Sequence, residues 1–354
     1  MRAITSVRDL ESTVGRRLLP ALLKSIAELD EHCRVFTELS PIGFLGFADA
    51  SGRSRAISVG GHPGFVGITS ATTIELALPS DLGDPPASGG GAALLLMIPG
   101  LRETLRINGR LTAGEGGKAI LDVEEAFLHC AKCVIRSRLW APADHEAASH
   151  ASHAGDGPDV GEGPLAGAGV LGLLARSPFA LIGSRDGSGA ADVSPKGDPP
   201  GFIRVLDGRT IAIPDRPGNR RTDTFHNVVE RPEVAVLAIV PGEDGAVEMS
   251  GTAAVTDDRD LLASMRVKGK APHAALLVTV TRAAFVRQEA IAAAGLWDAA
   301  KAPADLDRFN VKRAWVDHVK QIRQAGLSAA LVRKAANEKV LGSGIDLDYK
   351  YKLY

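Results

Sequence analysis

An internal repeat constrains this chain of 354 residues more than any other feature. Short β-like runs separated by Gly, Asp and Ser follow Ser40-Pro41, and a similar series follows Ser177-Pro178. Placing Ser40 on Ser177 also places Pro63-Gly64-Phe65 on Pro200-Gly201-Phe202 without a gap. Small gaps then align three further segments: Ile98-Pro99-Gly100 with Val240-Pro241-Gly242, Ala126-Phe127 with Ala284-Phe285, and Leu139-Trp140 with Leu296-Trp297. An ordered series of matches indicates the duplication of one domain.

The repeat divides the chain into five predicted regions. They are an N-terminal helical arm (1–39), a first domain (40–142), a flexible linker (143–168), a second domain (169–298) and a C-terminal helical tail (299–354). The arm carries Leu22, Ile26 and Leu29 at helical spacing, and the tail carries Trp315 and Val319. These patterns predict a mainly β fold with flanking helices, an α+β architecture.

Composition and charge narrow the classes of function. The formal net charge of −1 offers no overall basic surface for nucleic acid. The apolar stretch from Ala92 to Pro99 is too short to span a bilayer, and the first residues lack a signal-peptide pattern. Three cysteines cannot all pair with one another. We therefore expect a cytoplasmic protein without nucleic-acid or membrane partners.

The second copy concentrates basic residues around two tight turns. Lys196 adjoins Gly197, while Arg216, Arg220 and Arg221 surround Pro217-Gly218. Such a turn exposes backbone N–H groups, and guanidinium groups match the oxygens of a phosphate. Ser194 and Asn219 add neutral donors. A solvated basic turn is the alternative for the second segment taken by itself. The two segments together predict a phosphate site.

The first copy lacks this phosphate site but keeps other polar groups. Val59 replaces Lys196, and residues 79–91 contain no equivalent of the arginine-rich turn. Conversely, Glu248 of the second copy stands where the first copy has Arg106. The first copy also retains three polar side chains of interest: Asn108, His129 and Lys132. Each copy lacks what the other keeps, which predicts one composite site between them.

Two long segments carry a family resemblance. ADVSPKGDPPGF and TIAIPDRPGNRRTDTFHNVVERPEVAVLAIVPG resemble the FMN-binding split-barrel proteins of the pyridoxamine-phosphate oxidase superfamily, in its predicted flavin-nucleotide-binding branch. EEAFLHCAKCVIRSRLW of the first copy and the closing KLY resemble the same branch. The resemblance implies two tandem split β-barrels that form an intramolecular pseudo-dimer. It also implies one FMN per chain, held where the two barrels meet.

The resemblance assigns roles to the candidate residues. Seven are expected to bind the cofactor: Asn108, Ser194, Lys196, Arg216, Asn219, Arg220 and Arg221. Three are expected to act in catalysis: Arg106, His129 and Lys132. No metal site is expected, and we interpret Cys130 and Cys133 as neighbours on a helix rather than a redox pair.

The predicted function is that of an FMN-dependent oxidoreductase acting on a small organic substrate. Oxidase, oxygenase and reductase chemistry all remain open. Two alternatives stay open as well, an F420-dependent reductase and a non-catalytic flavin- or haem-binding protein. The fused copies are expected to act as a monomer or to form a homodimer.

Overall fold

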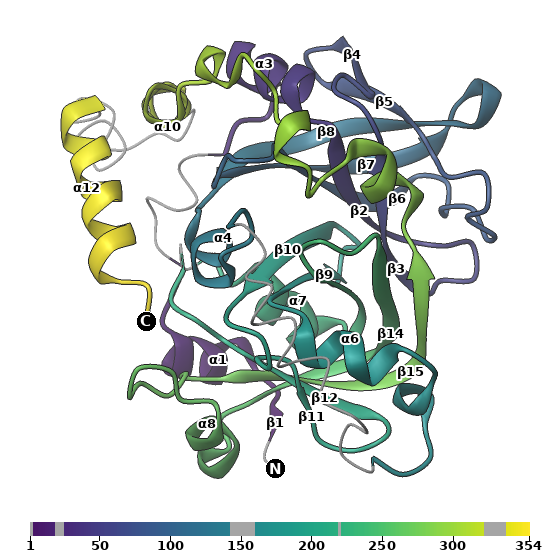
Figure 1. The fold of residues 1–354 in the computed structure, drawn as a ribbon, viewed down its shortest axis with the longest axis vertical. Helices are drawn as coiled ribbons and strands as arrows, with labels where there is room; N and C mark the ends of the chain where they lie inside the picture. Colours follow the sequence, from purple (N-terminus) through teal and green to yellow (C-terminus); the bar gives the residue numbers. More distant parts are fainter. Residues whose placement is uncertain (1–2, 18–24, 142–159, 219–220, 322–337) are drawn as a thin grey trace.

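Two antiparallel sheets dominate the structure (Figure 1). The computed structural model describes residues 3–17, 25–141, 160–218, 221–321 and 338–354. The first sheet contains, in chain order, β2 (Ile42–Ala48), β3 (Ser54–Gly60), β4 (Val66–Ser70), β5 (Thr73–Ala77), β6 (Gly90–Met97), β7 (Thr104–Ala113) and β8 (Lys118–His129). Across the sheet the strand order is β3-β2-β6-β7-β8-β5-β4.

The second sheet repeats this topology. It contains β9 (Phe179–Arg185), β10 (Ala191–Gly197), β11 (Arg204–Val205), β12 (Thr210–Pro214), β13 (Glu233–Ile239), β14 (Gly245–Thr256) and β15 (Ala275–Arg287). The order is β10-β9-β13-β14-β15-β12-β11, which is the first order with β2 to β8 replaced by β9 to β15. The structure therefore confirms a mainly β fold with two related domains in tandem.

A bulge interrupts the same strand pair in both sheets. The register of β7 with β8 shifts at Gly109, and that of β14 with β15 shifts at Gly251. A Cβ atom would lie 1.9 Å from a carbonyl oxygen at Gly109 and 2.0 Å at Gly251, so both positions require glycine. Counted from the bulge, Phe127 corresponds to Ala284. The alignment of the two copies by sequence places Phe127 opposite Phe285, so that alignment is wrong by one residue along this strand.

A short helix followed by a tryptophan closes each copy. In the first copy this helix is α4 (Lys132–Ser137), and in the second it is α9 (Glu289–Ala294). The indole of Trp140 donates to the carbonyl of Leu101 at 2.6 Å, and that of Trp297 donates to the carbonyl of Glu243 at 2.8 Å. The two indole rings lie 6.0 Å apart. The matched tryptophans therefore meet where the copies join.

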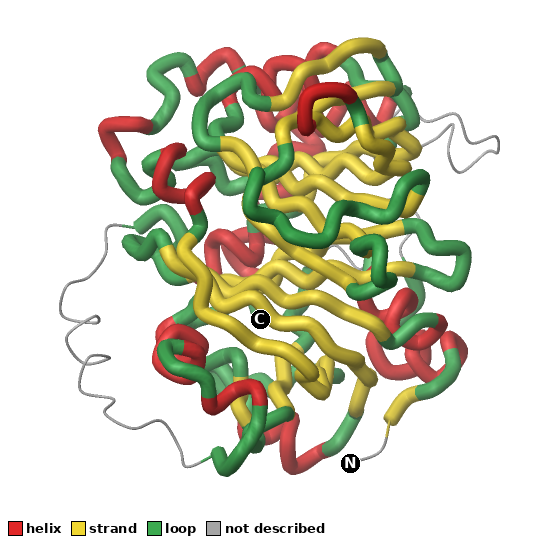
Figure 2. Tube along the Cα trace, turned by 90° about the vertical axis from the view of Figure 1, so that its right-hand side faces the viewer, coloured by secondary structure: helices red, strands yellow, loops and turns green. Residues whose placement is uncertain are grey.

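Three large buried apolar clusters, formed by the described residues, hold the molecule together. One lies within each sheet, and a third joins Phe44 and Leu95 of the first sheet to Leu181 and Leu237 of the second. Side chains alternate along a strand, so Leu94 faces the core of its own sheet while Leu95 faces the other sheet. Figure 2 shows the strands of both sheets in the middle of the molecule and the helices around them.

The terminal segments cross between the copies (Figure 1). At the N-terminal end, β1 (Ala3–Ile4) pairs with β14, and α1 (Val7–Val14) contacts α7 (Asp223–Glu230) of the second copy. At the other end, α10 (Val311–Lys320) places Trp315 against the core of the first sheet. Each terminal segment thus packs on the copy farther from it in the sequence.

The N-terminal arm differs from the single helical stripe that its spacing predicts. Ile26 forms a β-bridge with Ala126, and the backbone of Leu29 hydrogen-bonds to Ala71, so neither residue is helical. Leu22 lies outside the described residues. The described part of the arm after residue 24 contains the helix α3 (Glu31–Leu39), which starts where the Asp30 carboxylate accepts the Cys33 N–H. The backbone pairing of Ile26 with β8 therefore outweighs the helix propensity of this segment.

The end of the predicted linker belongs to the second copy. Leu165 is fully buried in the core of the second sheet, in a 3-10 turn (Pro164–Ala166) before α6 (Val170–Arg176). Residues 142–159 lie outside the described residues. Within the described ranges, no helix has the length and apolarity needed to cross a bilayer.

Candidate functional site

A cavity of about 640 Å³ lies between the two copies. The first copy contributes Arg106 from β7, His129 from the end of β8 and Arg136 from α4. The second copy contributes the end of β10, the turn that follows β12 and the start of α7. The chain therefore forms one cavity from segments that lie far apart in the sequence.

Strand β10 brings two predicted residues to this cavity. Ser194 and Lys196 point to the same side because they are two positions apart on a strand. Ser194 accepts a hydrogen bond from Arg106 at 3.0 Å. The amine of Lys196 lies 5.0 Å from the centre of the Phe225 ring and forms no ion pair with any described residue. Lys196 is thus a cation available to an anionic ligand.

Arg216 is anchored at the rim of the cavity. Its Nε donates to the Asp198 carboxylate at 2.6 Å, and its Nη2 donates to the carbonyl of Met265 at 2.8 Å. The hydroxyl of Tyr354 donates to the other oxygen of Asp198 at 2.8 Å. The charge of Arg216 is therefore balanced by a buried carboxylate, and the turn is held in one position.

Arg106 is the largest fully buried side chain among the described residues. It forms ion pairs with Asp192 and Asp223 of the second copy and lies 4.4 Å from the centre of the Phe127 ring. Burial raises the pKa of Asp192, and Arg106 opposes that rise. Burial also acts on Asp223, but Arg106 and then Arg221 hold its pKa well below the ordinary value. Two carboxylates thus neutralise Arg106.

Arg221 extends the same network. It donates to Asp223 at 2.8 Å and to both oxygens of Glu125 at 2.9 and 3.1 Å. Asn108 also donates to Glu125, at 3.1 Å, and does not line the cavity. The predicted cofactor ligands Asn108 and Arg221 therefore serve an ion-pair network between the copies. The sequence did not reveal the partner carboxylates because they are distant in the chain.

Arg136 is a cavity residue that the predicted set leaves out. Its guanidinium donates to the carbonyls of Gly197 at 2.9 Å, Pro217 at 2.9 Å and Leu353 at 3.0 Å. Neutral carbonyls hold its position without cancelling its charge. In the sequence, Arg136 lies in the basic run RSR of the segment EEAFLHCAKCVIRSRLW, which carries the family resemblance.

Positive charge exceeds negative charge along the described lining. Six lysine or arginine side chains face three aspartates: Arg106, Arg136, Lys196, Arg216, Arg221 and Lys270 against Asp198, Asp215 and Asp223. Burial raises the pKa of Asp215, and the charges of Lys196 and Arg136 oppose that rise. Asp192 and Glu125 lie behind the lining and pair with Arg106 and Arg221, so the net excess is one positive charge, which favours an anionic ligand.

His129, Cys130 and Cys133 lie on the side of the cavity that the first copy forms. Nδ1 of His129 lies 3.3 Å from the carbonyl oxygen of Cys130. Cys130 and Cys133 both line the cavity and are buried as free thiols. Burial raises the pKa of Cys133 to about 12, and Cys130 adds to this rise. The thiol is therefore protonated at neutral pH.

Besides Asn108, three predicted residues have no described place in the cavity. Lys132 forms an ion pair with Asp348 at 2.8 Å, and its side chain is 4% exposed and does not line the cavity. The structure thus gives Lys132 a role in holding α12 (Glu338–Tyr351) rather than the catalytic place expected for it. Asn219 and Arg220 lie outside the described residues.

The equivalent position on the other side of the interface has reversed charges. Glu248 occupies the strand position of Arg106, and Arg55 occupies that of Asp192. Their side chains approach to 3.8 Å. Buried Val59 stands where the cavity has Lys196. This second position therefore lacks the ammonium group that makes the first position attractive to an anion.

The strand order and the shared cavity define a tandem pair of split-barrel-like domains with a crevice between them that is lined by more basic than acidic side chains. Residues 170–287 match the family model described as pyridoxamine 5'-phosphate oxidase. This match covers the second copy, and the first sheet repeats the strand order of that copy.

Solved structures of the same kind resemble parts of the chain. A putative pyridoxamine 5'-phosphate oxidase from Lactobacillus delbrueckii is 23% identical over 30% of this chain and 83% of its own, with a TM-score of 0.24. A structure described as an F420 reductase is 18% identical over 36% of this chain and 100% of its own, with a TM-score of 0.25. The haem storage protein HutZ from Vibrio cholerae is 11% identical over 33% of this chain and 89% of its own, with a TM-score of 0.24. No curated protein matches the chain.

Proposed function

We propose that this protein binds one FMN per chain in the cavity between its copies and uses it for redox chemistry on a small organic substrate. The observation that carries the proposal is the shared cavity, in which Lys196 of one copy and His129 of the other line the same space. The family match of residues 170–287 supports a flavin as the ligand.

The residues present fit a phosphate-bearing cofactor. A phosphate monoester carries a charge of about −1.5 to −2 at neutral pH. The cavity keeps an excess of positive charge after the ion pairs of Arg106 and Arg221 are counted, and Lys196 makes no ion pair with any described residue. We assign the phosphate end to Lys196 and to the turn that Arg216 anchors. Arg136 holds the backbone of both segments through Gly197 and Pro217.

The first copy supplies the groups for chemistry. A bound flavin supplies the electron transfer. The imidazole of His129 is able to give or accept a proton near neutral pH. Arg106 is a positioning residue, because it holds Ser194 at 3.0 Å and is itself neutralised by two aspartates.

Release and identification of the chromophore tests this proposal. Denaturing the purified protein should release FMN at one equivalent per chain, identified by its mass and its paired visible bands. A ratio of two would contradict the composite site. Release of F420 or haem, or a colourless protein that takes up no added FMN, would overturn the cofactor assignment.

A second measurement separates an enzyme from a carrier. The photoreduced protein should react with oxygen or an organic acceptor faster than free FMN does. His129→Asn should slow that reaction while flavin occupancy stays the same. Reoxidation no faster than that of free flavin would favour a carrier.

A further inference from the structure

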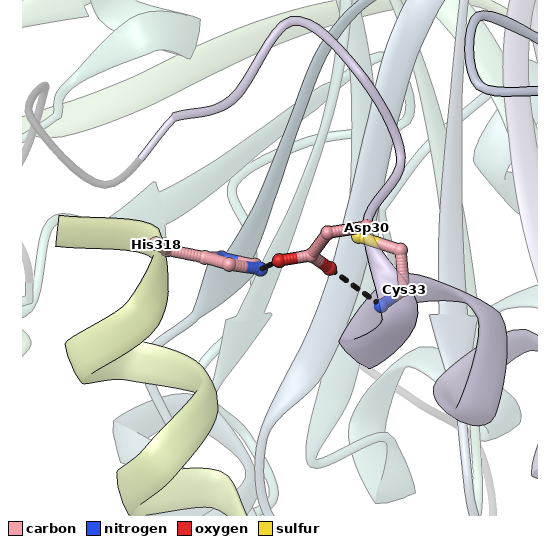
Figure 3. A group of neighbouring side chains, drawn as sticks. All are labelled: Asp30, Cys33 and His318. Atoms are coloured by element: carbon pink, nitrogen blue, oxygen red, sulfur yellow. Dashed lines mark hydrogen bonds and ion pairs between the residues drawn. The ribbon is translucent and has the colours of Figure 1, made fainter. Parts of the chain in front are cut away.

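Outside the cavity, three side chains of metal-binding type meet where the two ends of the chain pack together. Asp30 caps α3, Cys33 lies in its first turn, and His318 lies on α10 (Figure 3). Cys33 is fully buried, His318 is 1% exposed, and the Asp30 side chain is 15% exposed. The cavity and the proposed flavin chemistry do not use this cluster.

The spacing of the ligand atoms is close to that of a tetrahedral metal site. One atom from each side chain, a carboxylate oxygen, Sγ and a ring nitrogen, lies within 4.8 Å of the other two. Nε2 of His318 lies 3.2 Å from Oδ2 of Asp30. Zinc–nitrogen and zinc–oxygen bonds of about 2.1 Å at a tetrahedral angle would separate these atoms by about 3.4 Å. This pair therefore already has nearly the required separation.

His318 has unsatisfied polar atoms that point to a missing ligand. Its Nδ1 and Nε2 are both buried and have no hydrogen-bond partner of acceptable geometry among the described residues. Nε2 nevertheless lies 3.2 Å from the Asp30 carboxylate, with which it forms an ion pair. A metal ion bound between Nε2 and this carboxylate would give the buried ring nitrogen a ligand bond in addition to this contact.

We propose that Asp30, Cys33 and His318 bind one Zn²⁺ ion that links α3 to α10. Sulfur, imidazole nitrogen and carboxylate oxygen together are the ligands that zinc takes, whereas Mg²⁺ and Ca²⁺ take oxygen. The partial exposure of Asp30 gives water access to the fourth position. The ion crosslinks residues nearly three hundred positions apart and so stabilises the packing of the C-terminal tail on the first copy.

Metal analysis of the intact protein tests this site. Protein produced with added zinc and then freed of loosely bound metal should contain one Zn²⁺ per chain. X-ray absorption at the zinc edge should show one sulfur neighbour at about 2.3 Å. Removing the ion with a chelator should lower the thermal unfolding midpoint. Flavin content need not change, so this result does not depend on the proposed function.

Matched variants assign the ligands. Cys33→Ser and His318→Gln should each reduce bound zinc at least tenfold. Asp30→Asn keeps an oxygen that caps α3 but weakens the ligand, so it should lose zinc while remaining folded. Cys130→Ser and His226→Ala, a buried cysteine and a buried histidine outside the cluster, should keep one zinc.

Two outcomes would overturn the proposal. One is a wild-type protein that contains less than a tenth of an equivalent of zinc after exposure to it. The other is an equal zinc content in the wild type and in Asp30→Asn. Either result would leave the cluster as a buried ion pair between Asp30 and His318.

Discussion

Cationic side chains in one cavity differ in what they can do, because their partners differ. Arg106 forms ion pairs with two aspartates, and Arg221 forms ion pairs with Asp223 and Glu125. Lys196 has no ion-pair partner among the described residues. A charge that is already neutralised attracts a further anion weakly, so we propose that Lys196 contributes more to cofactor affinity than Arg106 or Arg221 does.

Removing the Lys196 amine should therefore weaken FMN binding. A hydrogen bond to a charged group contributes about 1.5–3 kcal/mol. Lys196→Ala should raise the Kd for FMN about tenfold to 150-fold, as measured by quenching of flavin fluorescence. Lys118→Ala, which removes an exposed lysine paired with Glu75, is the control and should leave the Kd unchanged. Equal affinities for the wild type and Lys196→Ala would disprove the assignment.

The raised pKa of Cys133 makes a prediction about thiol reactivity. With a pKa of about 12, the thiolate fraction at pH 8 is about one in ten thousand. Iodoacetamide at pH 8 should leave native Cys133 unmodified and should modify it in urea, as peptide mass spectrometry would detect. The folded state holds this proton more tightly than the unfolded chain. This contribution to stability is therefore complete below pH 9 and declines as the pH rises from 9 toward 12. Rapid alkylation of the native thiol would refute the prediction.

At the scale of elements, the same bulged hairpin occurs in both sheets, and its geometry requires glycine at one position. β7 and β8 in one sheet, and β14 and β15 in the other, bend at a glycine that lies against the backbone of the neighbouring strand. The bulge re-aims the strand positions beyond it. It thereby sets which face of β7 carries Arg106 into the interface.

Alanine at either bulge glycine should destabilise the protein. Gly109→Ala and Gly251→Ala each place a methyl group about 2 Å from a carbonyl oxygen, so the backbone must shift. We expect a loss of about 3 kcal/mol for each, measured by urea unfolding. Gly344→Ala in α12 meets open space and should gain up to about 1 kcal/mol. Losses below about 0.5 kcal/mol at both bulges would show that the strands tolerate a side chain there.

At the scale of the whole molecule, the two copies are joined by one apolar face and by two sets of ion pairs, in both of which the first copy supplies an arginine and the second copy supplies carboxylates. Phe44, Leu95, Leu181 and Leu237 lie in the shared apolar cluster. On one side a first-copy arginine meets second-copy aspartates, and on the other a first-copy arginine meets Glu248. Charges arranged in this way favour one docking of the copies over others.

The shared cluster should make the copies unfold together. A large apolar interface couples domains, whereas small polar interfaces let them move apart. Calorimetry should show one unfolding transition for the intact chain. Leu181→Ala should shift that whole transition downward, with a cost of about 2–5 kcal/mol. Two resolved transitions, in the wild type or in the variant, would show that the copies are independently stable.

Much of the fold and part of the site followed from the sequence. The repeat predicted two related β domains, and the complementary losses predicted that groups from both would face each other. Arg106, His129, Ser194, Lys196, Arg216 and Arg221 do line one cavity. The prediction failed where distant contacts decide the outcome. Ile26 pairs with a strand instead of continuing a helix, and Lys132 pairs with Asp348 instead of facing the cavity.

The sequence by itself determined the duplicated topology, because periodicity, turn residues and bulge glycines are local and occur in both halves. It also determined which residue types each half retained. Only the tertiary structure decided which cations are neutralised, because their partners come from the other copy. It likewise brought Asp30 and Cys33 to His318. Electrostatic interactions depend on distance in space, and spacing along the chain does not reveal that distance.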